Sequence, residues 1–294
     1  AISFIYFCKP LKIQYNKTRY RFLIMEKKRI LIVTHEIKPY LILSEIARIT
    51  NALPIYLLEQ GFEIRVMMPR FGHINERRHR LHEVVRLSGI NIIIDEDDYP
   101  LIIKVASLPG ARLQVYFLDN EDFFKRKHDF TDEKGNFYAD NAERMIFFCK
   151  GVMETIKKFG WPPDILHCHG WMTSLIPMYM KTTYKKEPVF HTTKMVYSVY
   201  PNQFEGSLNK IFNDKAMISK DIKATDFAPF KKADNISLTL GGMTHADALI
   251  VGSDKIPAQA KTLLKTLKKP ILQPEAAADL NAEYLEFYKK LWKK

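Results

Sequence analysis

The sequence predicts an α/β protein built around a doubly wound parallel sheet. Short runs of β-branched residues alternate with segments of helical periodicity, and turn residues separate them. The first unit is a strand at Arg29–Thr34, a helix over Ser44–Glu59 that stops at Gly61, and a strand at Glu63–Met68 closed by Pro69. Because crossovers of this kind join parallel strands, helices are expected on both faces of the sheet.

The alternation continues to the end of the chain. The acidic run Asp95–Asp98 is typical of a turn between antiparallel strands and predicts a local insertion, whereas residues 200–234 show no clear period. The further expected strands are Ile90–Ile94, Leu101–Ser107, Leu113–Leu118, Asp164–His169, Lys194–Val199, Ala248–Val251 and Ile271–Leu272. The further expected helices are Asn141–Phe159, Met172–Lys181, Pro257–Lys268 and Ala276–Trp292.

One domain over residues 25–294 is the simplest organisation for this pattern, because the Pro and Gly residues are dispersed and mark no linker. The first 24 residues contain five basic and no acidic residues and precede Met25. We therefore expect residues 1–24 to be a non-native or disordered extension. Apolar residues recur at helical spacing over Asn281–Trp292 and predict a C-terminal helix that caps the sheet.

Composition predicts a globular chain of the reducing cytoplasm. The 294 residues are 47% apolar, and no apolar run reaches roughly 18 residues, the length that a membrane-spanning helix needs. The three cysteines form no C-x-x-C pair and favour neither a disulfide framework nor a zinc ribbon. Removing the five basic residues of the extension lowers the formal net charge from +12 to +7. The lysines are scattered between acidic residues, which argues against nucleic acid or a membrane as a partner.

Ligands of open parallel sheets bind beyond the carboxyl ends of the strands, so the residues that follow each strand are the candidates. These residues are Thr34-His35-Glu36, Pro69-Arg70-Phe71-Gly72, His167–Trp171 and Gly252-Ser253. His167 and His169 stand two apart, which places both side chains on one face of a strand. They fit packing inside the fold, contact with a sugar hydroxyl or a phosphate, or, with further ligands, a metal ion.

A D-x-D string lies within Asp95–Asp98 and admits either a divalent ion or a solvated hairpin turn. The turn requires fewer assumptions, and we expect no metal site.

Six long strings occur in order between Lys28 and Ala260. They are RILIVTHEI, NALPIYLLEQGFEIRVMMPRFG, VYFLDNEDFF, FYADNAERMIFF, WPPDILHCHGWMTSLIPMYM and GGMTHADALIVGSDKI. Together they resemble the N-terminal domain of the bacterial glycogen and plant starch synthases, glycosyltransferase family 5. Within that family the chain is most similar to the short synthase-like proteins of Bacteroidetes-type bacteria.

The resemblance implies a Rossmann-like sheet equivalent to the N-terminal half of a two-domain GT-B glycosyltransferase. Such enzymes transfer glucose from ADP-glucose to an α-1,4-glucan with retention of configuration. They need no metal or other cofactor, because basic residues and helix N-termini neutralise the pyrophosphate. The expected substrate-binding residues are Glu36, Lys38, Tyr138, Asp140, Asn141, His167, His169 and Trp171, and no catalytic residue is assigned.

The sequence departs from the family pattern at three places. Where the family has Lys-x-Gly-Gly-Leu, Ile42–Ile46 reads ILSEI, so the phosphate-contacting lysine and the glycines are absent and Lys38 is the nearby cation. His169–Met172 replaces the family's His-Asp-Trp-His, and Val196–Tyr200 replaces T-x-H-N-x-x-Y-Q-G. The second half of the family's fold does not fit into the remaining residues.

Two functional hypotheses follow from these observations. In the first, the chain is a glycogen or starch synthase-like protein with impaired or no catalysis alone; its partners would be an α-glucan, ADP-glucose and a separate second-half subunit. In the second, it is a non-catalytic domain that binds glucan or a partner synthase. Phe137, Tyr138 and Trp171 are aromatic residues suited to stacking on sugar rings.

Overall fold

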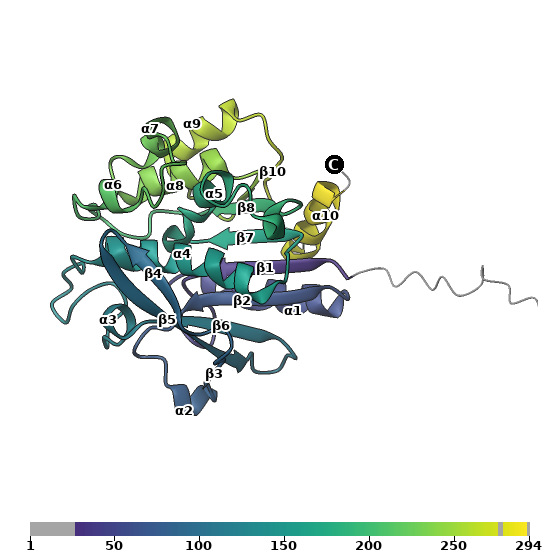
Figure 1. Cartoon of the computed structure of the whole chain (residues 1–294). Coiled ribbons are helices and arrows are strands. Elements are labelled where there is room, and N and C mark those ends of the chain that lie inside the picture. Colours follow the sequence, from purple (N-terminus) through teal and green to yellow (C-terminus); the bar gives the residue numbers. More distant parts are fainter. Residues whose placement is uncertain (1–26, 276–278, 293–294) are drawn as a thin grey trace, which may run out of the picture.

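A mainly parallel, ten-stranded sheet organises the chain (Figure 1). The computed structural model describes residues 27–275 and 279–292, so the predicted extension at residues 1–24 and the suggested start at Met25 lie outside the described residues. The strand order is β10-β9-β8-β7-β1-β2-β6-β5-β3, with β4 paired to β5. The predicted α/β fold with a doubly wound parallel sheet is confirmed.

The parallel strands correspond closely to the predicted ones. They are β1 (Arg29–Thr34), β2 (Glu63–Pro69), β6 (Gln114–Asp119), β7 (Ile165–His169), β8 (Lys194–Val199), β9 (Ala248–Val251) and β10 (Ile271–Leu272). β1 lies near the centre, where Ile32 is in register with Val66 of β2 on one side and with His167 of β7 on the other. All residues of β1 after the first are buried, as expected for a parallel strand covered on both faces.

The predicted antiparallel insertion is also present. β5 (Asp97–Ser107) pairs antiparallel with β6, with β4 (Ile90–Ile94) and with β3 (His82–Glu83). β5 begins earlier than predicted, so two residues of the acidic run join the strand. The turn itself is Asp95 and Glu96, and Asp95 takes the left-handed conformation with φ 59°.

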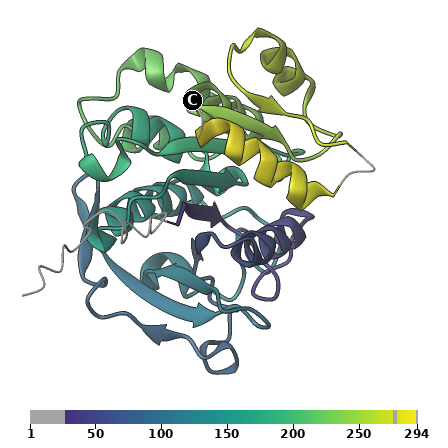
Figure 2. The same ribbon diagram turned by 90° about the vertical axis from the view of Figure 1, so that its right-hand side faces the viewer.

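Helices cover the two faces of the sheet in separate groups. On one face α1 (Ile46–Glu59) packs against α10 (Leu280–Trp292), as Figure 2 shows. On the other face α4 (Asn141–Phe159) contacts α5 (Ile176–Lys181), which in turn contacts α8 (Asn235–His245). The remaining helical segments are α2 (Glu76–His79), α3 (Glu121–Phe124), α6 (Phe212–Lys215), α7 (Ala224–Phe227) and α9 (Ala258–Thr266), with 3-10 turns at Trp171–Thr173, Pro188–Phe190 and Ala228–Phe230.

Several helices differ from the sequence prediction. The helix predicted from Met172 starts as a 3-10 turn and becomes α-helical only at Ile176. The helix predicted over Ala276–Trp292 begins at Leu280, since Asp279 is not helical, and residues 276–278 lie outside the described part. The four-residue helices α2, α3, α6 and α7 were not predicted. α8 was not predicted, since its interior contains two glycines, which disfavour helix.

Those glycines are needed for packing. A Cβ on Gly241 would lie 2.1 Å from the ring of Phe230, and one on Gly242 would lie 2.8 Å from the ring of Tyr197. Close approach of two aromatic rings therefore outweighs the poor helix propensity of glycine in α8. No helix in the described part of the chain is long and apolar enough to cross a membrane.

Lys269 closes the C-terminal end of α8. Its Nζ donates to the carbonyl oxygens of Met243, Thr244 and Ala246 at 2.9, 3.0 and 2.6 Å. These carbonyls have no partner within the helix, and a cation at this end also interacts favourably with the helix dipole. Burial lowers the pKa of Lys269.

We expect Lys269→Met to lower the free energy of unfolding by about 1–2 kcal/mol, because three carbonyls lose a charged donor. Urea unfolding followed by circular dichroism would measure this change. The matched control is Lys268→Met, since Lys268 is the exposed neighbour and should change the free energy by less than about 0.5 kcal/mol. Equal unfolding midpoints for the two variants would contradict the capping role.

Candidate functional site

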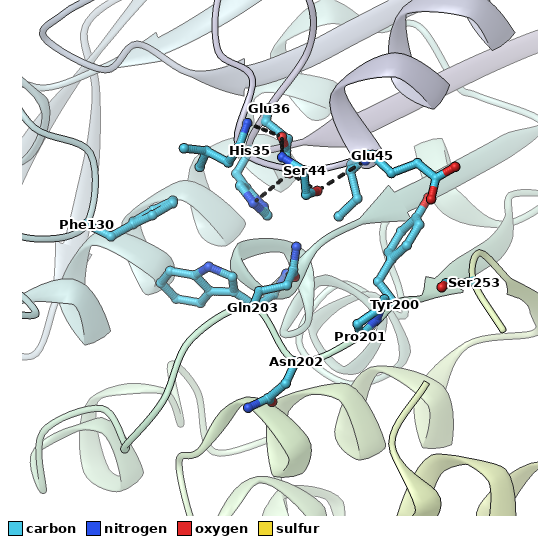
Figure 3. Close-up of a pocket in the computed structure, with 13 residues that line it drawn as sticks. His35, Glu36, Ser44, Glu45, Phe130, Tyr200, Pro201, Asn202, Gln203 and Ser253 are labelled. Carbon is cyan, nitrogen blue, oxygen red and sulfur yellow. Dashed lines mark hydrogen bonds and ion pairs between the residues drawn. The ribbon is translucent and has the colours of Figure 1, made fainter. Parts of the chain in front are cut away.

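A cavity of about 280 Å³ opens at the carboxyl ends of β1, β7, β8 and β9 (Figure 3). We call it the strand-end cavity. It lies where the chain order reverses, because β2 follows β1 on one side and β7 adjoins β1 on the other. Such switch points are the usual ligand sites of open α/β sheets. The lining residues are His35, Glu36, Leu43, Ser44, Glu45, Ile46, Phe130, Trp171, Tyr200, Pro201, Asn202, Gln203 and Ser253.

Three of the four predicted strand-end groups contribute to this cavity. His35 and Glu36 follow β1, Trp171 follows β7, and Ser253 follows β9. The fourth group, after β2, does not line it. In that group the Nε of Arg70 lies 2.9 Å from the carboxylate of Asp119. The two residues form an ion pair further along the sheet edge.

Glu36 holds the loop that leads into α1. Its Oε2 accepts the backbone N–H groups of Leu43 and Ser44 at 2.7 and 2.8 Å, and its Oε1 accepts the Ser44 hydroxyl at 2.5 Å. The Ser44 Oγ in turn accepts the N–H of Ile46, the first residue of the helix. The carboxylate of Glu36 therefore occupies backbone donors that would otherwise be available to an anionic ligand.

The loop before α1 exposes apolar side chains. Ile42 and Leu43 are 62% and 50% exposed, and Leu43 borders the cavity. Glu45 lies beside them and pairs with Arg48 at 2.8 Å. Lys38 is exposed but is not among the lining residues; its backbone bonds to Ala47 and Asn51 on the first turns of α1.

The wall at the end of β7 is aromatic. Trp171 lies 5.1 Å from Phe130 and 6.3 Å from His35, measured between ring centroids. The His35 ring sits directly on Gly170, where a Cβ would be 2.1 Å from the ring and where φ is +80°. Gly170 is therefore required by both its conformation and the close approach. Burial lowers the pKa of His35, although Glu36 and Asp129 oppose this effect.

A second cavity of about 460 Å³ adjoins the first, and we call it the side cavity. The two cavities share Leu43, Phe130 and Gln203. Phe137 and Phe204 line the side cavity and stack with ring centroids 5.0 Å apart. Aromatic side chains therefore contribute to the walls of both cavities.

The expected site residues Tyr138, Asp140 and Asn141 do not line either cavity. They surround Arg144, which is buried on α4. The Asn141 amide donates to the carbonyl of Phe130 at 2.8 Å, and Arg144 donates to the carbonyls of Phe123 and Asp129.

The rest of this cluster is held by Arg126. It pairs with Asp140 through two bonds of 2.7 and 2.5 Å and lies 4.6 Å over the ring of Tyr138. Together, Arg126 and residues Tyr138–Arg144 therefore fix the loop that carries Phe130 to the cavity wall.

His167 and His169 lie inside the fold, behind the cavity wall. His167 bonds to the hydroxyl of Tyr288 on α10 at 2.6 Å and to the Ser198 hydroxyl at 2.8 Å. His169 bonds to the Tyr200 hydroxyl at 2.7 Å and to His167 at 3.1 Å. As predicted, both histidines point to one face of β7. Of the three alternatives for the pair, packing with internal hydrogen bonds is the one that this geometry fits.

Burial keeps both histidines neutral. It lowers the pKa of His169 to about 3 and that of His167 well below its ordinary value, and each is lowered further by a neighbouring histidine. In residues 27–275 and 279–292, no group of three or more His, Cys, Asp or Glu side chains is placed to hold a metal ion.

Sequence reasoning missed the cavity residues that come from the aperiodic segment after β8. Tyr200, Asn202 and Gln203 line the strand-end cavity, and the Gln203 Oε1 accepts the N–H of Trp171 at 2.9 Å. Periodicity could not find these residues, because they belong to no helix or strand. Their only signal was their position just after a parallel strand.

Comparison with known proteins shows the family. The family model described as the starch synthase catalytic domain matches residues 29–265. The chain therefore belongs to this family, as its strings suggested. It spans about half the length of the curated relatives that it matches.

Two relatives are the glycogen synthases of Chlorobium limicola and Chlorobaculum parvum, each 38% identical to this chain. The matches cover 76% and 80% of this chain, and 45% and 47% of the relatives. The catalytic domain of starch synthase IV from Arabidopsis thaliana, solved with ADP and acarbose, superposes with a TM-score of 0.64 at 15% identity. That match covers 90% of this chain and 50% of the other, and it shows that the two share a fold.

We expect acid to destabilise the fold through the two buried histidines. Their pKa values are lowered in the folded state, so the unfolded state binds more protons below about pH 6.5 and stability falls as the pH falls. For two such groups, the free energy of unfolding should fall by about 2–3 kcal/mol between pH 7.5 and pH 5.5. Urea unfolding at the two pH values would measure it.

The exposed His82 provides the control, since His82→Gln should retain the full pH dependence. The double variant His167→Gln/His169→Gln should show a smaller dependence. The same pH dependence in all three proteins would refute this origin of acid sensitivity.

Proposed function

We propose that this chain is a glucan-binding member of the starch synthase family that does not transfer glucose by itself. One observation supports this proposal above the others: the lining of the strand-end cavity includes two carboxylates, Glu36 and Glu45, and among the described residues no lysine or arginine. A sugar chain is uncharged and a nucleoside diphosphate is not. The lining therefore favours the sugar.

Charge argues against a pyrophosphate in this cavity. A carboxylate about 4 Å from a phosphate costs about 1 kcal/mol in water and about 4 kcal/mol at the effective dielectric of a protein surface. The backbone amides of Leu43 and Ser44 already bond to Glu36. Neither Lys38 nor Arg48 lines the cavity to offset these effects.

The same lining suits a sugar. Phe130 offers a partly exposed apolar ring, backed by the buried rings of Trp171 and Tyr200, and Gln203 and Asn202 offer amide groups that can bond to hydroxyls. The side cavity extends the space past Gln203, which favours an oligosaccharide over a single sugar. The Arabidopsis domain with the same fold was solved with both ADP and acarbose. We propose that this chain retains the sugar-binding capacity and lacks the nucleotide-binding capacity.

Gln203 lines both cavities. We therefore expect Gln203→Ala to weaken the binding of maltoheptaose about tenfold, because the sugar loses one or two hydrogen bonds. Isothermal calorimetry would measure the affinity. Gln60→Ala is the control, because Gln60 is exposed at the opposite end of α1 and should bind like the unmodified chain. A chain that shows no heat with millimolar maltoheptaose would exclude the glucan proposal.

For ADP we expect no detectable binding at millimolar ligand, and consequently no effect of Lys38→Ala. The physical reason is the acidic lining and the occupied amides of the loop. Calorimetry with ADP tests this directly. A clear isotherm that Lys38→Ala abolishes would instead make Lys38 the substitute for the family's lysine and return the chain to the nucleotide-binding synthases.

The alternative is an active synthase half that works with a separate second-half subunit. Family membership favours this alternative. Incubation with ADP-glucose or UDP-glucose and glycogen, with and without cell extract, separates the two. Transfer of glucose that needs both this chain and the extract would establish the alternative.

A further inference from the structure

We infer that Tyr288 on the C-terminal helix is a positioning residue for the strand-end cavity, acting through His167, His169 and Tyr200. The positioning itself is a property of the fold. Its consequence for affinity rests on the proposed glucan binding.

An unbroken chain of buried hydrogen bonds connects α10 to the cavity wall. The Tyr288 hydroxyl lies 2.6 Å from Nδ1 of His167, and that atom lies 3.1 Å from Nε2 of His169. Nδ1 of His169 lies 2.7 Å from the hydroxyl of Tyr200, which lines the cavity. Tyr288 and both histidines are fully buried, and Tyr200 is 5% exposed.

Counting protons couples the two histidines. Burial raises the pKa values of Tyr200 and Tyr288 and lowers those of both histidines, so the phenols are protonated and the imidazoles neutral. Each neutral imidazole has one N–H group and one lone pair. The bond between Nε2 of His169 and Nδ1 of His167 therefore requires the same tautomer in both rings, either Nε2–H or Nδ1–H. Nδ1 of His167 also contacts Tyr288, so the two bonds share one hydrogen or one lone pair, and a change in one affects the other.

Tyr200 connects this chain of hydrogen bonds to the rest of the cavity wall. Its ring lies against Gly252, where an added Cβ would be 2.3 Å from the ring. The next residues, Pro201, Asn202 and Gln203, also line the cavity, and Gln203 bonds to the backbone of Trp171. Releasing the Tyr200 hydroxyl would therefore loosen a continuous part of the wall.

The experiment compares Tyr288→Phe with Tyr179→Phe. Tyr179 on α5 is as deeply buried, and its hydroxyl donates to the carbonyl of Ala216 at 3.0 Å, outside this chain of hydrogen bonds. Three measurements are made on each chain: ¹⁵N resonances of the histidine rings, amide hydrogen exchange over residues 199–204, and the affinity for maltoheptaose.

In the unmodified chain, the spectra should show the same tautomer for His167 and His169. Tyr288→Phe should shift the Nδ1 resonances of His167 and His169, speed the exchange of residues 199–204 about fivefold, and weaken maltoheptaose binding about fivefold. Tyr179→Phe, which also removes a buried hydroxyl, should leave all three nearly unchanged. A purely structural role of Tyr288 would lower stability without moving exchange at these distant residues.

If Tyr288→Phe alters neither the His169 resonance nor the exchange of residues 199–204, the inference is wrong, whatever the glucan result. If both respond but the unmodified chain binds no maltoheptaose, the positioning role stands and the proposed function fails. Should Tyr288→Phe not fold, Tyr200→Phe tests the chain from its other end. It should then speed exchange within residues 280–292, and unchanged exchange there would overturn the inference.

Discussion

Glu36 is a buried carboxylate at the end of the central strand, and the loop before α1 takes its shape from that one group. Removing a charge from water costs several kcal/mol unless hydrogen bonds compensate, and here two amides and a hydroxyl provide them. The same bonds fix the entry into α1 and place Leu43 and Ser44 at the cavity. Because these backbone amides already bond to Glu36, they are not available to a ligand in the cavity.

The two faces of the sheet contribute differently to the cavity. His167 points to the face covered by α10, and its neighbour Cys168 points to the opposite face, where it lies near Cys149 of α4. On the α10 face, hydrogen bonds between neutral groups tie the helix to Tyr200. On the α4 face, Arg144 ties the helix to the loop that carries Phe130. The cavity thus lies between two independently anchored walls.

The parallel strands could be predicted from the sequence almost residue by residue, because buried parallel strands are continuous apolar runs between turn residues. The predictions failed where tertiary contacts decide. α8 forms despite Gly241 and Gly242, since Phe230 and Tyr197 pack onto them. β3 is only two residues long and leaves no periodic signal.

For the site, the strand ends supplied four of the thirteen residues that line the strand-end cavity. His35, Glu36, Trp171 and Ser253 line the cavity because parallel strands end at one edge of the sheet. That His167 and His169 share a face followed from the two-residue period, but their position behind the wall depends on where α10 packs. Gln203 lies in an aperiodic loop, so no local pattern could place it.

The contacts of the family-like strings show what these residues do in this chain. The segment Tyr138–Arg144 clamps a loop from inside, and His167 and His169 bond to other buried side chains. These residues serve the fold, whether or not glucose is transferred. Residues Leu43–Glu45 line the cavity, so their side chains bear directly on what it can hold. Family membership therefore establishes the architecture of this chain, and the residues that face the cavity must decide its ligand.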